Sequence, residues 1–75
     1  MNRTKMNQAI TKLTQAYEDQ LQADRAFHYF INVVMNDANQ DAEWQRNELA
    51  KQFEARHAAE DEVDRAKAQL RKLAA

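Results

Sequence analysis

The sequence predicts an all-α protein in which two long antiparallel helices form a coiled-coil-like helical hairpin. Its 75 residues include no Gly, Pro or Cys. Tight turns between strands draw on Gly, Asn-Gly or Asp-Gly, and the chain has none of these signals, so a sheet is not expected. Most of the sequence consists of Ala, Gln, Glu, Lys, Arg and Leu, which lose little side-chain freedom in a helix.

The first predicted helix covers about residues 4–35, where apolar side chains recur every three or four positions and form one face. Only Gln20 and Asp24 interrupt this face with polar groups. A second ridge of smaller residues widens it. The first ridge contains Met6, Ile10, Leu13, Tyr17, Phe27, Ile31 and Val34, and the second contains Ala9, Ala16, Ala23 and Phe30.

The second predicted helix covers about residues 41–73 and repeats this spacing, with a polar interruption at Gln52 and Arg56. Phe53 lies beside the face. The apolar members are Leu49, Ala59, Val63, Ala66, Leu70 and Leu73. The alternative to the hairpin is one continuous helix of about 110 Å, at roughly 1.5 Å per residue, which would need a second chain to cover its apolar face.

The predicted bend lies at about residues 36–40, in a cluster of short polar side chains that compete for backbone hydrogen bonds. Asn36 or Asn39 is the expected left-handed residue that ends the first helix, because no Gly is present. Asp37 followed by Gln40 resembles an N-capping arrangement for the second helix. The chain from 1 to 75 is therefore expected to form one hairpin domain.

The polar interruptions of the two helices are expected to meet across the hairpin. A bend centred near Ala38 places residues opposite each other when their numbers add to about 77, which brings Asp24 close to Arg56. An ion pair there would fix the register more than it would add stability, because desolvation offsets most of the attraction. In the alternative interpretation, both side chains bend towards solvent and never meet.

Basic residues gather at the open end of the predicted hairpin, which has no acidic residue in segments 1–12 and 65–75. The bend instead carries the acids Asp37, Asp41, Glu43 and Glu48. Such a basic end suits an anionic partner, although solvated faces with local ion pairs would explain it equally. Its members are Arg3, Lys5, Lys12, Arg65, Lys67, Arg71 and Lys72.

Large apolar side chains before the bend point in nearly every direction around the helix, so one partner helix cannot cover them all. Aromatic side chains gathered in one zone are the usual anchors of binding energy. The alternative is that these rings form a small local core at the bend. The predicted partner interface consists of Phe27, Tyr29, Phe30, Val33, Val34, Met35 and Trp44.

The residues do not favour an enzyme. Cys and Ser are absent, phosphate-binding loops require Gly, and a two-helix rod offers no enclosed pocket. We expect no cofactor and no metal, since His57 beside Glu60 and Asp61 is a weak metal-binding pattern. No apolar run reaches the roughly 18 residues of a membrane span, so a cytoplasmic, non-membrane protein is expected.

The sequence thus favours a small protein–protein interaction module that acts as an adaptor, subunit or inhibitor of a larger assembly. A homodimer in the form of a four-helix bundle is the simplest way to enclose the excess apolar surface. The second hypothesis is a helical bundle that binds nucleic acid through the basic end.

Overall fold

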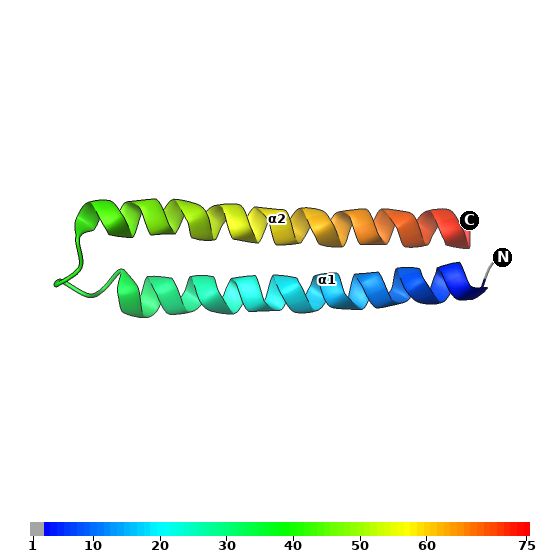
Figure 1. Cartoon of the computed structure of the whole chain (residues 1–75), viewed down its shortest axis with the longest axis horizontal. Helices are drawn as coiled ribbons and strands as arrows, with labels where there is room; N and C mark the ends of the chain where they lie inside the picture. Colours follow the sequence, from blue (N-terminus) through cyan, green and yellow to red (C-terminus); the bar gives the residue numbers. More distant parts are fainter. Residues whose placement is uncertain (1–2) are drawn as a thin grey trace.

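The computed structural model describes residues 3–75 as two long helices joined by a short bend. Helix α1 spans Arg3–Tyr29, a π-helical turn η1 spans Phe30–Val34, and helix α2 spans Ala42–Ala74. The helices lie side by side in opposite directions, and the first turn of α1 meets the last turn of α2 at the open end (Figure 1). The rod measures 57 × 14 × 13 Å.

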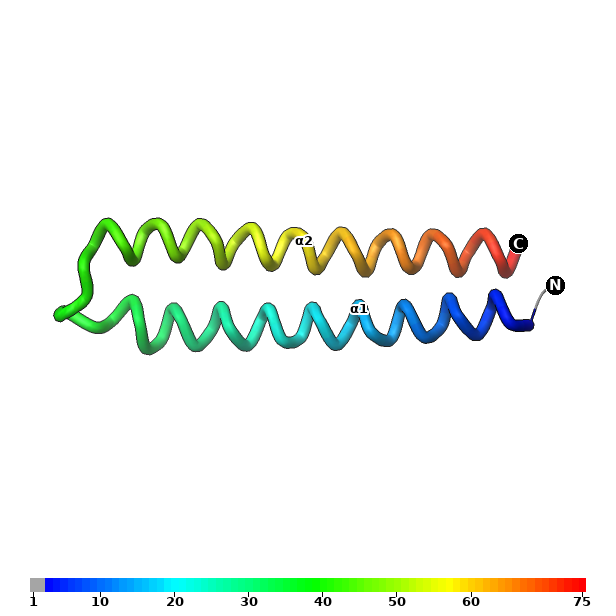
Figure 2. The backbone as a smooth tube through the Cα atoms, in the orientation of Figure 1, coloured from blue at the N-terminus to red at the C-terminus, as the bar shows by residue number. Residues whose placement is uncertain are grey.

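This arrangement confirms the predicted all-α hairpin of two packed helices, with no strand in residues 3–75. The continuous-helix alternative is wrong, because the chain reverses direction between η1 and α2 (Figure 2). The reversal occupies residues 35–41, where the sequence has its cluster of Asn and Asp.

The contact between the helices is built on small residues. Ala9 and Ala16 of α1 are buried, as are Val63 of α2 and Phe30 of η1. Ile10 and Tyr17 were expected in the core, yet both remain about half exposed. The seam therefore follows the alanine ridge, since small side chains allow two helices to approach closely, and Ile10 and Tyr17 lie at its edge. The other members of the bulkier ridge are partly covered, namely Met6, Leu13, Phe27, Ile31 and Val34.

The first helix ends in a π turn instead of the expected left-handed residue. Met35 N–H donates to Phe30 O at 2.9 Å, and Asp37 N–H donates to Val34 O at 3.2 Å. No residue among 3–75 has a positive φ angle, so the prediction for Asn36 or Asn39 is wrong. Asn36 Nδ2 instead donates to Asn32 O at 2.9 Å, and this side-chain bond satisfies a carbonyl that the helix end would leave open.

Helix α2 begins at a cap different from the predicted one. The N-cap is Asp41, whose Oδ1 accepts from Glu43 N–H at 2.8 Å. Asp37 instead shapes the bend, because its Oδ1 accepts from Asn39 N–H at 2.9 Å and its carbonyl accepts from Gln40 N–H at 3.2 Å. The prediction that Asp37 and Gln40 cap the helix is wrong, because the helix starts at Ala42, five residues after Asp37.

One side chain connects the two ends of the bend. Gln45 Nε2 donates to Val34 O at 2.8 Å and to Asp37 O at 3.2 Å. Gln45 lies in the first turn of α2, while Val34 is the last residue of η1. Carbonyls at the end of a helix lack regular helical donors, and the Gln45 amide supplies a donor to Val34 O at the end of η1 and to Asp37 O in the bend. It thereby holds the two helices together at the bend.

Candidate interaction surfaces

Asp24 and Arg56 lie in contact across the seam. Arg56 Nε donates to Asp24 Oδ1 at 3.2 Å, and the two side chains are 30% and 37% exposed for Arg56 and Asp24. The Arg56 guanidinium also lies over the Phe27 ring, 4.3 Å from its centroid. Phe27 in turn packs against Phe53 of α2, with the ring centroids 5.1 Å apart. Two rings and an ion pair thus form one cluster between the helices.

The residue numbers of the pairs Asp24–Arg56 and Phe27–Phe53 both add to 80, whereas the sequence predicted about 77. Helical side chains lean towards the N-terminus of their own helix. Contacting residues on antiparallel helices are therefore displaced by about one position along each chain from the backbones that face each other. This lean accounts for most of the difference.

The structure divides the predicted aromatic interface into covered and exposed members. Phe30 is only 5% exposed and packs against Trp44, with the ring centroids 6.3 Å apart. Phe27, Val34 and Met35 are partly covered. Tyr29, Val33 and Trp44 keep 63%, 50% and 43% of their surface exposed. We call these three residues the tip patch.

Contacts across the seam define two sides of the rod. Lys12 and Arg65 line one groove together, so they lie on the same side. Tyr17 and Lys67 also lie together, with the Lys67 Nζ 5.5 Å from the Tyr17 ring centroid. On α1, Tyr17 follows Lys12 by five residues, which places it on the opposite flank of the seam. We refer to the Lys12 side and the Tyr17 side.

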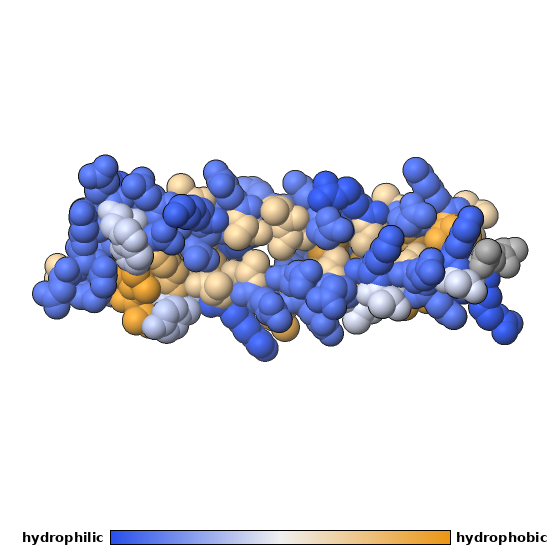
Figure 3. All heavy atoms as spheres, viewed as in Figure 1, coloured by the Kyte–Doolittle hydropathy of each residue, from blue (hydrophilic) through white to orange (hydrophobic). Residues whose placement is uncertain are grey.

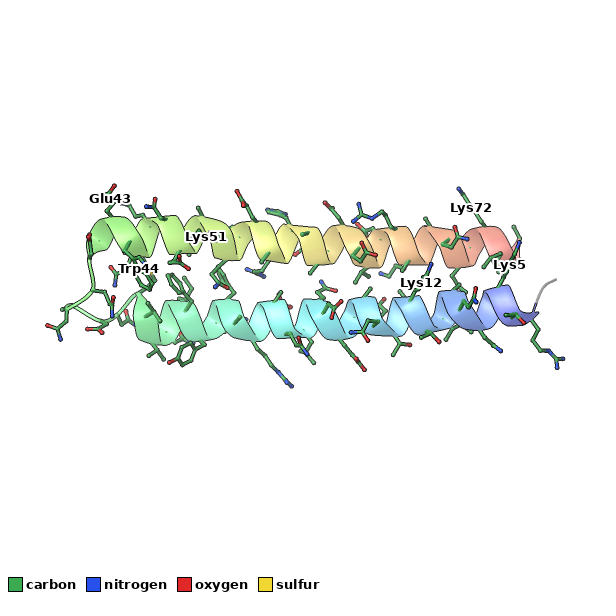
Figure 4. The ribbon with its side chains drawn as sticks, in the orientation of Figure 1. Lys5, Lys12, Glu43, Trp44, Lys51 and Lys72 are labelled. Atoms are coloured by element: carbon green, nitrogen blue, oxygen red, sulfur yellow. The ribbon has the colours of Figure 1, made fainter. Side chains whose placement is uncertain are left out.

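Heptad spacing places the tip patch on the Lys12 side. Tyr29, the last residue of α1, follows Gln8 by three heptads, and Gln8 lines a groove with Lys12. Trp44 precedes Arg65 by three heptads within α2. A seven-residue repeat returns to the same flank of a coiled coil, and Tyr29 lies one helical turn before Val33. Apolar atoms gather beside the bend on the face shown in Figure 3. Trp44 is labelled in this region in Figure 4, viewed from the same direction, and points from α2 towards α1.

The basic residues are gathered at the open end, with Lys12 and Arg65 on the Lys12 side and Lys67 on the Tyr17 side. Lys5 and Lys12 reach from α1 towards α2, while Lys72 points away from α1 (Figure 4). Lys5, Lys12 and Gln69 line a groove of about 270 Å³ that adjoins the Lys12–Arg65 groove. Arg65 Nη2 donates a hydrogen bond to Glu62 Oε2 at 2.8 Å, and this bond together with the attraction of the carboxylate raises the pKa of Arg65.

An exposed apolar stripe on the Tyr17 side was not predicted. Ile10, Tyr17 and Leu21 are 48%, 46% and 50% exposed, and they lie seven and four residues apart on one flank of α1. We call these three residues the α1 stripe. The sequence shows both ridges but does not choose between them, and only the structure, with the alanine ridge at the centre of the seam, turns Ile10 and Tyr17 to its edge.

The described residues include no group of three or more His, Asp or Glu side chains placed to hold a metal ion. His57 Nδ1 lies 3.9 Å from Glu60 Oε2, but no third ligand joins them. In residues 3–75, neither helix is long and apolar enough to cross a membrane. A comparison with known proteins found no matching family model, no similar curated protein and no similar solved structure.

Proposed function

We propose that this protein is a small protein–protein interaction module that docks on another protein through the tip patch and serves as an adaptor, subunit or inhibitor of a larger assembly. The observation that carries this proposal is the exposure of Tyr29, Val33 and Trp44 next to one another on the Lys12 side. Aromatic side chains with a polar edge are the residues that most often anchor protein interfaces.

The surroundings of the tip patch define the chemistry of its partner. The bend carries the acids Asp37, Asp41 and Glu43, and Glu48 lies one turn after Trp44 with Lys51 as its ion-pair partner at 3.1 Å. A complementary partner has an apolar pocket for the Trp44 ring and basic groups around the pocket. Contact of this kind combines apolar burial at the centre with polar pairing at the rim.

The patch is also held in place before a partner arrives. Trp44 packs on Phe30, and Gln45 ties the start of α2 to Val34 and Asp37. Residues of the patch come from both sides of the bend, so these contacts fix Trp44 relative to Val33. A surface that is ordered in the free protein loses less entropy on binding.

The proposal is tested with the chain's single tryptophan as a reporter. The partner is captured from the protein's own host with the wild-type chain, identified, purified and titrated into the wild-type chain. Docking at the tip patch shifts the Trp44 emission to shorter wavelength and protects it from acrylamide quenching, because the half-exposed ring becomes buried. Unchanged Trp44 emission in a complex that forms would refute docking at this patch.

A matched pair of variants separates this surface from the rest of α1. Val33→Lys and Leu21→Lys each place a lysine where a half-exposed aliphatic residue stood, on opposite sides of the same rod. Val33→Lys is expected to weaken partner binding at least about tenfold, since a buried charge replaces an apolar contact. Leu21→Lys is expected to leave partner affinity unchanged, and equal effects of both changes would contradict the proposal.

The second candidate function is nucleic-acid binding, favoured by the adjoining grooves that Lys5, Lys12 and Arg65 line at the open end. Binding through phosphate contacts weakens steeply with salt, whereas apolar docking changes little. Titration with a fluorescent single-stranded or duplex oligonucleotide at several salt concentrations distinguishes them. Binding that Lys12→Ala weakens, together with a steep salt dependence, would favour this second function.

A further inference from the structure

The hairpin buries very little by itself. In residues 3–75, only Ala9, Ala16, Phe30 and Val63 are buried, and two of these are alanines. Chains of this size depend on a dense core, disulfides, a metal or association with another chain for stability. The sequence has no Cys, and the described residues form no metal cluster. Association is the remaining means of covering more apolar surface.

The α1 stripe is the surface best placed for such an association. It carries three large apolar side chains over about three helical turns, all about half exposed, and it borders the apolar seam at Leu13 and Phe27. The flank of α2 beside it is different, because the Tyr17 side of α2 carries Glu60, Asp64 and Lys67 in this region. In this region the apolar part of the side therefore belongs to α1, while Phe53 of α2, which is 45% exposed, lies on the same side nearer the bend.

Symmetry then decides the orientation of a second copy on this side. If two rods pack with their bends at the same end, α1 of one copy faces α2 of the other, and the stripe meets charged groups. If one rod is reversed, α1 faces α1, and Tyr17 and Leu21 of one copy meet Leu21 and Tyr17 of the other around an axis between them. Two-fold contacts of this kind use the same patch on both copies.

The charge distribution favours the same reversed orientation. The open end, residues 1–12 and 65–75, has seven basic residues and no acid, while residues 36–48 have four acids and one base. Reversal places each basic end beside the acidic bend of the other copy, whereas the parallel arrangement places like charges together.

We infer that the Tyr17 side is a self-association surface, on which a second copy of the chain packs in reverse with the two α1 stripes in contact. This goes beyond docking at the tip patch and does not depend on it, because the two surfaces lie on opposite sides of the rod. In the dimer, both tip patches face outwards, and they lie near opposite ends. One dimer would thus present two separate docking surfaces.

The first test is the oligomeric state of the full chain in solution. Sedimentation or light scattering over a dilution series is expected to show a dimer that dissociates on dilution, with a melting temperature that rises with concentration. Leu21→Lys is expected to raise the dimer dissociation constant by about tenfold or more, because both copies lose an apolar contact. Val33→Lys, the matched control on the other side, is expected to leave it unchanged.

Circular dichroism of Leu21→Lys shows whether the variant still folds. If it unfolds, the concentration dependence of the wild-type melting temperature decides the question. A wild-type chain that is monomeric at every concentration, or whose melting temperature is independent of concentration, would overturn the inference. So would a dimer that Val33→Lys disrupts and Leu21→Lys does not.

The second test measures orientation. Because the chain has no Cys, Ala38→Cys accepts a single spin label at the bend of each copy. Electron–electron distance measurement is expected to give a separation close to the 57 Å length of the rod, since reversal places the two bends at opposite ends. A separation of less than half that length would overturn the reversed arrangement. Trp44 emission is expected to stay constant on dilution, which distinguishes self-association from docking at the tip patch.

Discussion

The contact of Arg56 with Asp24 and Phe27 allows a quantitative test of what the polar interruption of the seam contributes. Replacing Asp24 and Arg56 by Ala, singly and together, gives a double-mutant cycle whose coupling energy isolates the pair. Exposed ion pairs contribute about 0.2–1 kcal/mol, and removal of one partner of a fully buried pair costs about 3–5 kcal/mol. Since the two side chains are 30% and 37% exposed, we expect a coupling of about 0.5–1 kcal/mol.

The single variants are expected to differ in size. Asp24→Ala loses the pair but gains helix propensity of roughly half a kcal/mol, so its net effect is small. Arg56→Ala also loses the stacking of its guanidinium on Phe27, which contributes about 0.5–1 kcal/mol. Arg56→Ala is therefore expected to destabilise the protein by about 1–2 kcal/mol in total.

The assay is unfolding by urea, followed by circular dichroism at one fixed protein concentration, because association would otherwise shift the midpoint. Urea is preferred to guanidinium, whose salt would screen the pair. Additive losses would show that Asp24 and Arg56 contribute nothing to each other. A coupling above about 3 kcal/mol would show that the pair is much less accessible to water than exposed fractions of 30% and 37% imply.

Two further substitutions test local features of the hairpin. Asp41→Ala removes the side-chain acceptor for Glu43 N–H and is expected to cost about 1 kcal/mol of unfolding free energy, measured by urea unfolding; no measurable loss would show that this cap does not stabilise α2. Ala16→Leu adds volume where the helices approach closely and is expected to lower stability by about 1–3 kcal/mol. Ala26→Leu, at an exposed position of α1, is the control for the same assay and is expected to be nearly neutral; equal effects at positions 16 and 26 would contradict an alanine seam.

The fold was predictable because it depends on composition and spacing. The chain has no Gly or Pro, so it lacks the residues that form tight turns between strands. Apolar residues recur every three or four positions in both halves, and this spacing favours helices. The cluster of Asn and Asp likewise indicated the bend. Its hydrogen bonds were not predictable, because Asp37, Asp41 and Asn36 all accept or donate locally, and only packing determines which of them begins the helix.

Which residues of α1 face α2 was less predictable than the positions of the two helices along the chain. Both ridges of α1 are apolar, so spacing alone could not decide whether Ile10 and Tyr17 or Ala9 and Ala16 face α2. The outcome depends on how closely the two backbones approach, which is a property of both helices together. Burial of Phe30 by Trp44 had the same origin, because it requires a contact across the bend between residues 14 positions apart.

Gln45 has a consequence for how this protein would associate with others. Its amide ties the end of η1 and the bend to the first turn of α2, although the chain there has neither Gly nor Pro to define a turn. Gln45→Ala would loosen the bend relative to the first turn of α2 without changing any residue of the tip patch. The dissociation rate constant of a partner would then rise while its association rate constant stays the same, because the free energy needed to keep the bend ordered would destabilise the bound complex.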